Sequence, residues 1–220
     1  MASSQTIQGY AAALLKNAFY RGVRNFSRLI SVLLFDLRCL GRSNLDFEGA
    51  AIVLSTHQSH FDPVLIGLSF NGRMNYLARR TLFNNRLLGV IIYLLNAIEL
   101  DRDRSGIAGL KEMLRRLKNG HKVLMFPEGT RSSDGKIAPL KPGFISVARR
   151  SRVPLVPVAI TGAFEALPRT ATIPRLYPIY VAFGERIEPE TVAGLSDDEL
   201  IDFIQARLMS LYRQANSLRG

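Results

Sequence analysis

The chain lacks several patterns that mark common classes of protein. Its single cysteine, Cys39, excludes an internal disulfide, and we expect a reducing compartment. The longest apolar run, over residues 87–98, has only about two-thirds of the ~18 uncharged residues that span a bilayer. The first residues lack the basic stretch and apolar run of a secretory signal. Because residues 1–35 contain arginine and serine but no acidic residue, an organelle transit segment stays open.

Basic residues, by contrast, are plentiful. The 220 residues include 29 Lys and Arg against 18 Asp and Glu, which gives a formal charge of +11. Arginine dominates this excess, and its planar guanidinium suits phosphate. Long Lys/Arg runs, zinc-finger spacing and aromatic nucleic-acid signatures are all missing. We therefore expect anionic membranes or phosphorylated ligands as partners, and no nucleic acid.

Short apolar runs alternate with helical patterns along most of the chain. Strands are expected over residues 50–55, 74–78, 122–126, 153–160 and 176–183, and helices over 62–70, from Ser105 to Gly120, and after the capping box at residues 196–199. Asp62 and Pro63 are predicted as N-cap and first-turn proline. Pro154 and Pro157 argue against a central place for their strand. The pattern predicts one α/β domain, a mostly parallel or mixed sheet flanked by helices, with ligands at the carboxyl ends of strands.

The N-terminal segment predicts an amphipathic helical motif. Residues 5–40 read as helical, dividing near Gly22, with an apolar face made of Phe26, Leu29, Ile30, Leu33, Leu34, Leu37 and Leu40. Flanking arginines favour a helix that lies in a lipid headgroup layer. The alternative is a helix that packs on the protein's own sheet. We divide the chain into this motif, residues 1–43, and an α/β domain, residues 44–220.

Two short segments carry the chemistry. In Thr56-His57-Gln58-Ser59-His60-Phe61-Asp62, the neutral imidazole of His57 can accept a proton, and Asp62 can orient it across the turn. The alternative is a polar turn in which Asp62 only caps a helix. A Gly-x-Ser-x-Gly elbow and the glycine patterns of nucleotide-binding loops are missing, so His57 would act on a hydroxyl of the substrate.

The second segment is Phe126-Pro127-Glu128-Gly129-Thr130-Arg131-Ser132. Here Glu128 can accept hydrogen bonds from hydroxyls, Gly129 allows close backbone approach, and Arg131 can clamp a phosphate. Arg102 offers a second phosphate contact. A charged turn, and an arginine paired with a neighbouring aspartate, are the alternatives.

These blocks resemble the 1-acylglycerol-3-phosphate acyltransferase family. The resemblance runs in order through His57-Gln58-Ser59-x-x-Asp62, Leu100-Asp101-Arg102, the block from Phe126 to Ser132, Lys141-x-Gly143, and the proline-rich block from Val153 to Val158. It implies His57 as general base, Asp62 as its assistant, and Arg102, Glu128, Gly129, Thr130 and Arg131 as substrate-binding residues. Thr56, His60 and Glu99 depart from the family pattern, which leaves the acceptor open.

The resemblance also implies the reaction and its location. We expect transfer of a fatty acyl group from acyl-CoA or acyl carrier protein to a lysophospholipid hydroxyl, most simply 1-acylglycerol-3-phosphate giving phosphatidic acid. Neither a metal nor another cofactor is expected. The protein would be peripheral or monotopic, at the cytoplasmic face of the cell membrane. The alternatives are a metal-dependent hydrolase using His57, His60, Asp62 and His121, and a non-catalytic membrane-binding module.

Overall fold

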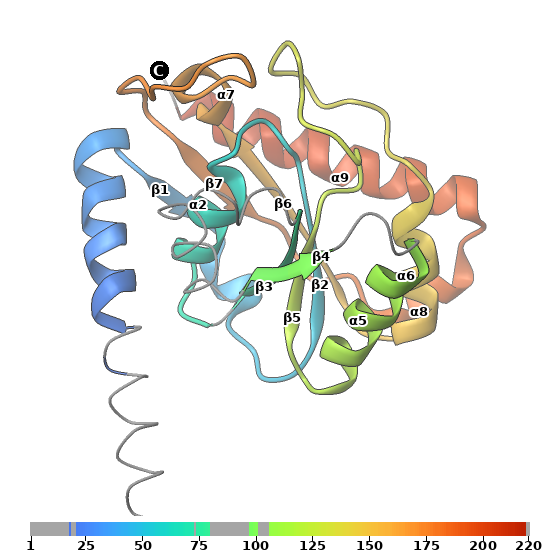
Figure 1. The fold of residues 1–220 in the computed structure, drawn as a ribbon. Helices are drawn as coiled ribbons and strands as arrows, with labels where there is room; N and C mark the ends of the chain where they lie inside the picture. Colours follow the sequence, from blue (N-terminus) through green and yellow to red (C-terminus); the bar gives the residue numbers. More distant parts are fainter. Residues whose placement is uncertain (1–17, 19–20, 73, 80–96, 101–105, 219–220) are drawn as a thin grey trace, which may run out of the picture.

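A seven-stranded mixed sheet forms the centre of the computed structural model, which describes residues 18, 21–72, 74–79, 97–100 and 106–218 (Figure 1). The strands are β1 (Arg38–Leu40), β2 (Ala51–Ser55), β3 (Met74–Arg79), β4 (Ala97–Leu100), β5 (Lys122–Met125), β6 (Leu155–Thr161) and β7 (Tyr180–Phe183). Their order is β1-β7-β6-β2-β5-β3-β4, and only the β6–β7 pair is antiparallel. The predicted α/β class and mixed sheet are confirmed.

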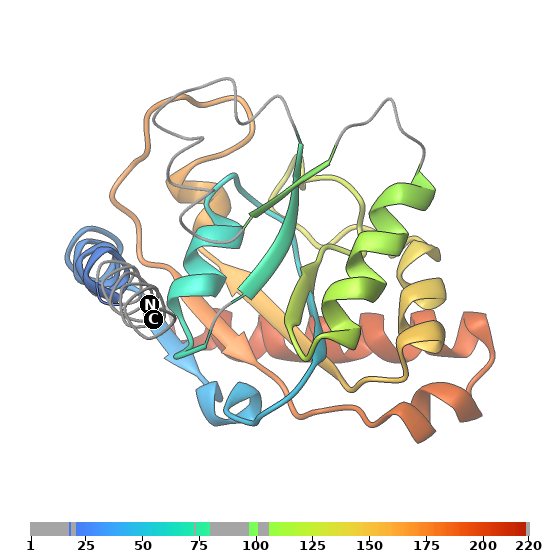
Figure 2. The ribbon, with the colours of Figure 1, turned by 60° about the horizontal axis from the view of Figure 1, so that its bottom comes forward.

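Helices cover both faces of this sheet (Figure 2). They are a helix over residues 21–35, the 3-10 helix η1 (Arg42–Leu45), α2 (Asp62–Leu68), α5 (Gly106–Lys118), α6 (Gly143–Ser151), α7 (Ala163–Ala166), α8 (Pro189–Gly194) and α9 (Asp197–Ser217). The period-two alternation of β2 divides the core between the two faces. Ala51 and Val53 pack in a cluster with α2 and α7, whereas Ile52 and Leu54 pack with α5, α6, α8 and α9.

The proline-containing strand has a more central place than its sequence predicted. β6 lies between β7 and β2, so the expectation drawn from Pro154 and Pro157 was wrong. Pro154 precedes the strand, and its carbonyl accepts a hydrogen bond from the Ile52 N–H. Pro157 lies opposite Gly184, the first residue after the end of β7, and its carbonyl accepts a hydrogen bond from the Gly184 N–H. The missing N–H of Pro157 therefore falls at a break in the ladder.

The N-terminal helix is shorter than predicted. It ends at residue 35, because Asp36 takes a left-handed φ of 41°, and Arg38–Leu40 then form β1 against β7. The prediction of helix through residue 40 was wrong, and most of residues 5–20 lie outside the described residues. β1 precedes the proposed boundary after residue 43, yet it belongs to the sheet of the α/β domain. That boundary stays a prediction.

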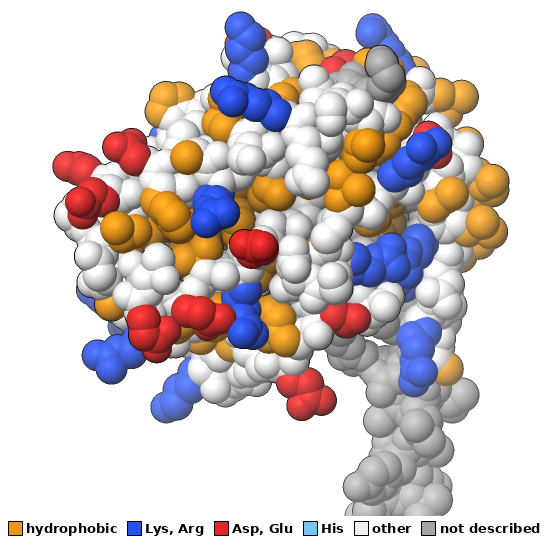
Figure 3. Space-filling model, turned by 180° about the vertical axis from the view of Figure 1, so that it is seen from behind, with side chains coloured by type: hydrophobic (Ala, Val, Ile, Leu, Met, Phe, Trp, Pro, Cys, Tyr) orange, Lys and Arg blue, Asp and Glu red, His pale blue; other side chains and the backbone are white. Residues whose placement is uncertain are grey.

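The same helix turns a mostly polar side to the protein, with buried Arg24 and Ser31 and one aromatic residue, Phe35. Arg24 is buried and donates from Nη1 to the Asn71 carbonyl at 2.8 Å, and Phe35 meets the Phe61 ring edge-on. The apolar side points outward, with exposed Phe26, Leu29, Ile30, Val32, Leu33 and Leu34. Figure 3 shows hydrophobic side chains on the flank from which this helix extends. Within the described residues, no helix combines the length and apolar character needed to cross a bilayer.

Candidate active site

The register of β2 and β5 brings the two chemical segments together. These strands are parallel neighbours in which Leu54 lies opposite Met125. His57 follows Leu54 at the same spacing as Glu128 follows Met125. His57 therefore comes opposite Glu128, beyond the carboxyl ends of both strands. This edge is where ligands bind in open α/β sheets. The sequence prediction that the two segments share one site is consistent with this register.

A fully buried carboxylate holds the imidazole. Asp62 Oδ2 lies 2.8 Å from His57 Nδ1, and it also accepts the backbone N–H groups of Gln58 at 2.6 Å and Ser59 at 2.7 Å. Burial raises the pKa of Asp62, while its hydrogen bonds with His57, Ser59 and Gln58 act in the opposite direction. Because the carboxylate accepts, Nδ1 of a neutral ring carries the proton and Nε2 is left as the proton acceptor.

Asp62 differs in one respect from its prediction. The N-cap of α2 is Phe61, and Asp62 is the first helical residue, with Pro63 next. Its side chain turns back to the preceding loop instead of capping the helix. The prediction of Asp62 as the N-cap was therefore wrong, whereas its expected place beside His57 is confirmed by the 2.8 Å distance.

The other contacts of His57 fix the plane of its ring. Phe126 stacks on the imidazole with ring centroids 3.8 Å apart and an angle of 16° between the planes. The His57 side chain is 18% exposed, so a ligand can reach it. Among the residues that the structure describes, none hydrogen-bonds Nε2. The ring therefore presents its basic nitrogen to whatever enters the site.

Glu128 holds the backbone of this site in place. Its Oε1 accepts the His57 N–H at 2.7 Å, its Oε2 accepts the Ala138 N–H at 2.8 Å, and the residue is 1% exposed. The His57 carbonyl in turn accepts the Ser132 N–H at 2.7 Å. Burial raises the pKa of Glu128, and the two backbone hydrogen bonds act against that shift. The geometry favours a positioning role over the expected contact with an acceptor hydroxyl.

The turn after Glu128 is open to a ligand. Gly129 and Thr130 are exposed and Arg131 is half-buried. Gly129 has a φ of +68°, and a Cβ there would lie 3.1 Å from the Lys141 side chain. The backbone conformation therefore favours glycine, and a Cβ would also require the Lys141 side chain to shift slightly. Cationic side chains at Arg131 and Lys141 border a backbone that a phosphate can approach closely.

Sequence reasoning missed several supports of the site. Tyr212 was read only as part of the apolar face of the last helix, yet its hydroxyl donates to the Gly135 carbonyl at 3.1 Å. Gln58 Nε2 donates to the same carbonyl at 2.7 Å. Phe126 was quoted as part of a motif, but its contact with His57 was not foreseen. Sequence separation hides such pairs, because only the packing of the loops, strands and α9 brings them together. Arg102 lies outside the described residues.

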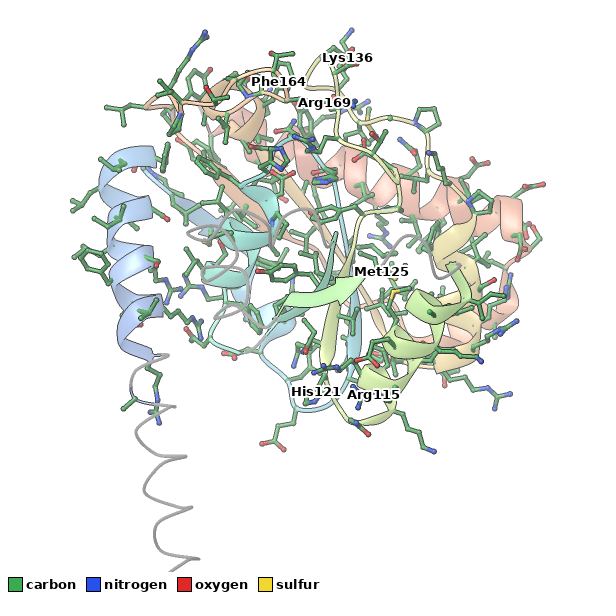
Figure 4. The ribbon with its side chains drawn as sticks, viewed as in Figure 1. Arg115, His121, Met125, Lys136, Phe164 and Arg169 are labelled. Atoms are coloured by element: carbon green, nitrogen blue, oxygen red, sulfur yellow. The ribbon has the colours of Figure 1, made fainter. Side chains whose placement is uncertain are left out.

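The geometry does not favour the metal-site alternative. His121 precedes β5, whereas His57 follows the parallel strand β2, so the two lie at opposite edges of the sheet. Figure 4 shows His121 and Arg115 at one edge, and Lys136, Phe164 and Arg169 at the other. His60 is exposed. No group of three or more metal-binding side chains occurs among the described residues.

Comparison with known proteins agrees with this fold. The family model Acyltransferase matches residues 36–161, more than half of the chain. The chain therefore belongs to the acyltransferase family, and it is an enzyme of that class. It is 29% identical over 144 residues to the 1-acyl-sn-glycerol-3-phosphate acyltransferase of Bacillus subtilis, covering 65% of this chain and 71% of that one.

Two further relatives extend the comparison. The 1-acyl-sn-glycerol-3-phosphate acyltransferase of Cocos nucifera is 32% identical over 159 residues, which cover 71% of this chain and 52% of the relative. Against several such plant relatives, the chain thus spans only about half of their length. The crystal structure of PlsC, the 1-acyl-sn-glycerophosphate acyltransferase of Thermotoga maritima, superposes with a TM-score of 0.75 at 25% identity, covering 93% of this chain and 82% of PlsC.

Proposed function

We propose that the protein transfers a fatty acyl group from an acyl thioester to the free hydroxyl of 1-acylglycerol-3-phosphate, giving phosphatidic acid. The relatives named above carry this acceptor in their names. The observation that carries the proposal is the His57–Asp62 pair, 2.8 Å apart, beside an exposed turn with cationic neighbours. The donor is either acyl-CoA or acyl carrier protein.

In the proposed reaction, His57 acts as general base. Nε2 takes the proton of the acceptor hydroxyl as its oxygen bonds to the thioester carbonyl carbon. The Asp62 carboxylate stabilises the imidazolium that forms. When the tetrahedral intermediate collapses, the carbon–sulfur bond breaks, and the departing thiolate takes the proton back from His57. The products are the new ester and a free thiol, and His57 is again neutral.

Acceptor binding is proposed for the exposed turn. The backbone of Gly129, the hydroxyl of Thr130 and the guanidinium of Arg131 are suited to a phosphate, and Arg102 is proposed as a further contact from the sequence alone. Glu128 is reassigned from acceptor binding to positioning, because both of its oxygens already accept backbone hydrogen bonds at a buried position. No step of this chemistry requires a metal or other cofactor, so we propose that none is needed.

We also propose that the enzyme is peripheral or monotopic, at the cytoplasmic face of the cell membrane. The outward apolar side of helix 21–35, six exposed side chains from Phe26 to Leu34, supports this association. This orientation favours the lipid-facing alternative over a helix packed on its own sheet. A lysophospholipid acceptor would reach the enzyme from that surface.

One assay tests the proposal. The purified protein is offered labelled acyl-CoA or acyl carrier protein with a panel of lysolipids, and products are identified by mass spectrometry. We expect phosphatidic acid from 1-acylglycerol-3-phosphate and unchanged turnover in a chelator. Vesicle binding without turnover on any lysolipid would support a non-catalytic module, and turnover lost together with a stoichiometric metal would support the hydrolase.

A further inference from the structure

The connection between β6 and β7 leaves the domain close to the candidate site. Thr161 and Tyr180 pair at the open end of this antiparallel hairpin, so residues 162–179 form one long excursion. α7 anchors its beginning, because Ala163, Ala166 and Leu167 are buried. The Leu167 carbonyl accepts the Ser59 hydroxyl at 2.8 Å, which ties the excursion to the loop that carries His57.

The remainder of the excursion displays apolar side chains. Ile173 is 78% exposed and Leu176 is 74% exposed, the two highest values among the large hydrophobic residues described. The loop nevertheless has a defined shape at its base. The Arg175 N–H donates to the Ala166 carbonyl at 2.7 Å, and the Ala171 N–H donates to the Pro168 carbonyl at 3.1 Å. Large apolar groups held outward by an ordered loop indicate a partner surface.

The charge of this loop indicates which partner. Residues 168–178 contain Arg169 and Arg175, both exposed, and no acidic residue. Apolar side chains flanked by arginines are suited to the boundary between acyl chains and anionic headgroups. A loop that binds a protein partner would be expected to carry a more mixed set of polar side chains.

The end of the loop also lies next to the carboxyl end of helix 21–35. The Ile179 N–H, at the end of the excursion, donates to the carbonyl of Phe35 at 2.8 Å, at the end of that helix. Ala163 and Phe35 belong to the same core cluster, on the face of the sheet that α2 covers. Figures 1 and 2 both show the excursion beside the helix. The two exposed apolar surfaces therefore lie on one side of the molecule.

We propose that residues 168–178 are a second membrane-binding element, in which Ile173 and Leu176 enter an anionic lipid surface and Arg169 and Arg175 contact its headgroups. The inference rests on the proposed membrane association of helix 21–35. With helix 21–35 and residues 168–178 both in contact with the membrane, the rim of the His57 site next to Leu167 would be held at the lipid surface, where a lysophospholipid enters.

The absence of tryptophan allows a direct test. Three single-tryptophan variants, Ile173→Trp, Leu176→Trp and Phe26→Trp, are compared with Ile107→Trp. Ile107 is 61% exposed on α5, which packs on the opposite face of the sheet. Each variant is mixed with vesicles of phosphatidylcholine and phosphatidylglycerol, with quenching lipids brominated in their acyl chains. A cooperative melting curve shows that each variant is folded, and turnover of detergent-dispersed substrate is measured separately.

We expect blue-shifted, bromine-quenched emission at positions 173, 176 and 26, and an unchanged spectrum at position 107. A shift at position 26 without any at 173 and 176 would overturn the loop proposal and leave the membrane association of the helix intact. No shift at any position would overturn both. Detergent-phase turnover is independent of these results, so a failure of the acyltransferase proposal would be recognised separately.

A second measurement separates charge from apolar contact. The double change Ile173→Ser and Leu176→Ser is expected to lower vesicle partitioning at least about tenfold. Arg169→Gln with Arg175→Gln should lower it about fivefold per arginine on anionic vesicles, and hardly at all on neutral ones. Ile107→Ser is the matched control. Partitioning equal to wild type in both double variants would contradict the proposal.

Discussion

His57 meets two different environments through its two ring nitrogens. Nδ1 faces the buried carboxylate of Asp62, and the ring lies flat against Phe126. Backbone hydrogen bonds to Glu128 and from Ser132 fix the residue at both its N–H and its carbonyl. An imidazole held in this way loses little orientational freedom when a substrate binds, which is what positioned proton transfer requires.

At the residue scale, Asp62→Asn tests the carboxylate charge. Because Oδ2 alone contacts Nδ1 and the Gln58 and Ser59 N–H groups, an asparagine oxygen in its place can still accept all three hydrogen bonds, but it carries no charge. The imidazolium that forms is then no longer stabilised by a carboxylate. We expect kcat to fall by about 10²–10⁴ with the melting temperature little changed. Turnover above a tenth of wild type, measured with a saturating acceptor, would contradict this role.

Glu128→Gln separates positioning from acceptor binding. Glutamine offers one oxygen to two backbone donors, so either the His57 or the Ala138 N–H loses its acceptor. We expect the shifted imidazole to lower kcat by up to about 10²-fold, with KM for the acceptor nearly unchanged. Glu185→Gln, at an exposed position after β7, is the control. A rise in KM at constant kcat would instead restore Glu128 to the acceptor site.

At the scale of elements, α9 shows how local sequence signals act through packing. Its capping box is formed as predicted: the Ser196 side chain accepts the Glu199 N–H, and the Glu199 side chain accepts the Ser196 N–H. The helix buries Leu200, Ile204 and Leu208 against the sheet. Near its carboxyl end, the helix also brings Tyr212 to the loop that contains Gly135, so this end of the helix supports one wall of the site.

Ser196→Ala should therefore lower stability. Loss of the cap costs about 1 kcal/mol of unfolding free energy, which urea denaturation can resolve. Ser210→Ala, at an exposed position within the same helix, should change stability by only a few tenths of a kcal/mol, because alanine favours the helix interior. Equal effects of the two substitutions would show that the box contributes nothing measurable.

Elements were predictable from sequence where a local pattern decided them. The apolar run before His57 and the capping box before α9 carry their own signals, and both elements formed. The place of β6 was not predictable, because whether Pro157 is tolerated depends on where β7 ends. Likewise, β1 is set by pairing with a strand far along the chain, and periodicity over residues 26–40 could not reveal it.

At the scale of the whole molecule, the sheet divides the protein into a catalytic edge and a lipid-facing flank. Helix 21–35 turns Arg24 toward the domain and its leucines outward. The sequence predicted an amphipathic helix but not the direction of its faces, since the outward face depends on acceptors at Asn71 and Gly72. In the same way, the sequence named His57 and Asp62, while only the structure showed that Glu128 holds the backbone of His57.

Leu33→Asp tests whether the apolar face of helix 21–35 points outward to lipid. Leu33 is 69% exposed, so we expect the unfolding free energy to change by no more than about 0.5 kcal/mol. Partitioning onto anionic vesicles, measured by co-sedimentation, should fall at least about tenfold, because an apolar side chain is replaced by a charge that anionic lipid repels. Ile107→Asp, on the opposite face, is the control. Lost stability with intact partitioning would mean that Leu33 packs within the protein.

The central claim is that Nε2 of His57 takes the proton of the acceptor hydroxyl. It is tested most directly by the turnover of purified His57→Ala with labelled acyl donor and 1-acylglycerol-3-phosphate. We predict a fall in kcat of about 10²–10⁴ in a variant whose melting curve and vesicle binding match wild type. Retention of most of the turnover by that folded variant would contradict the account.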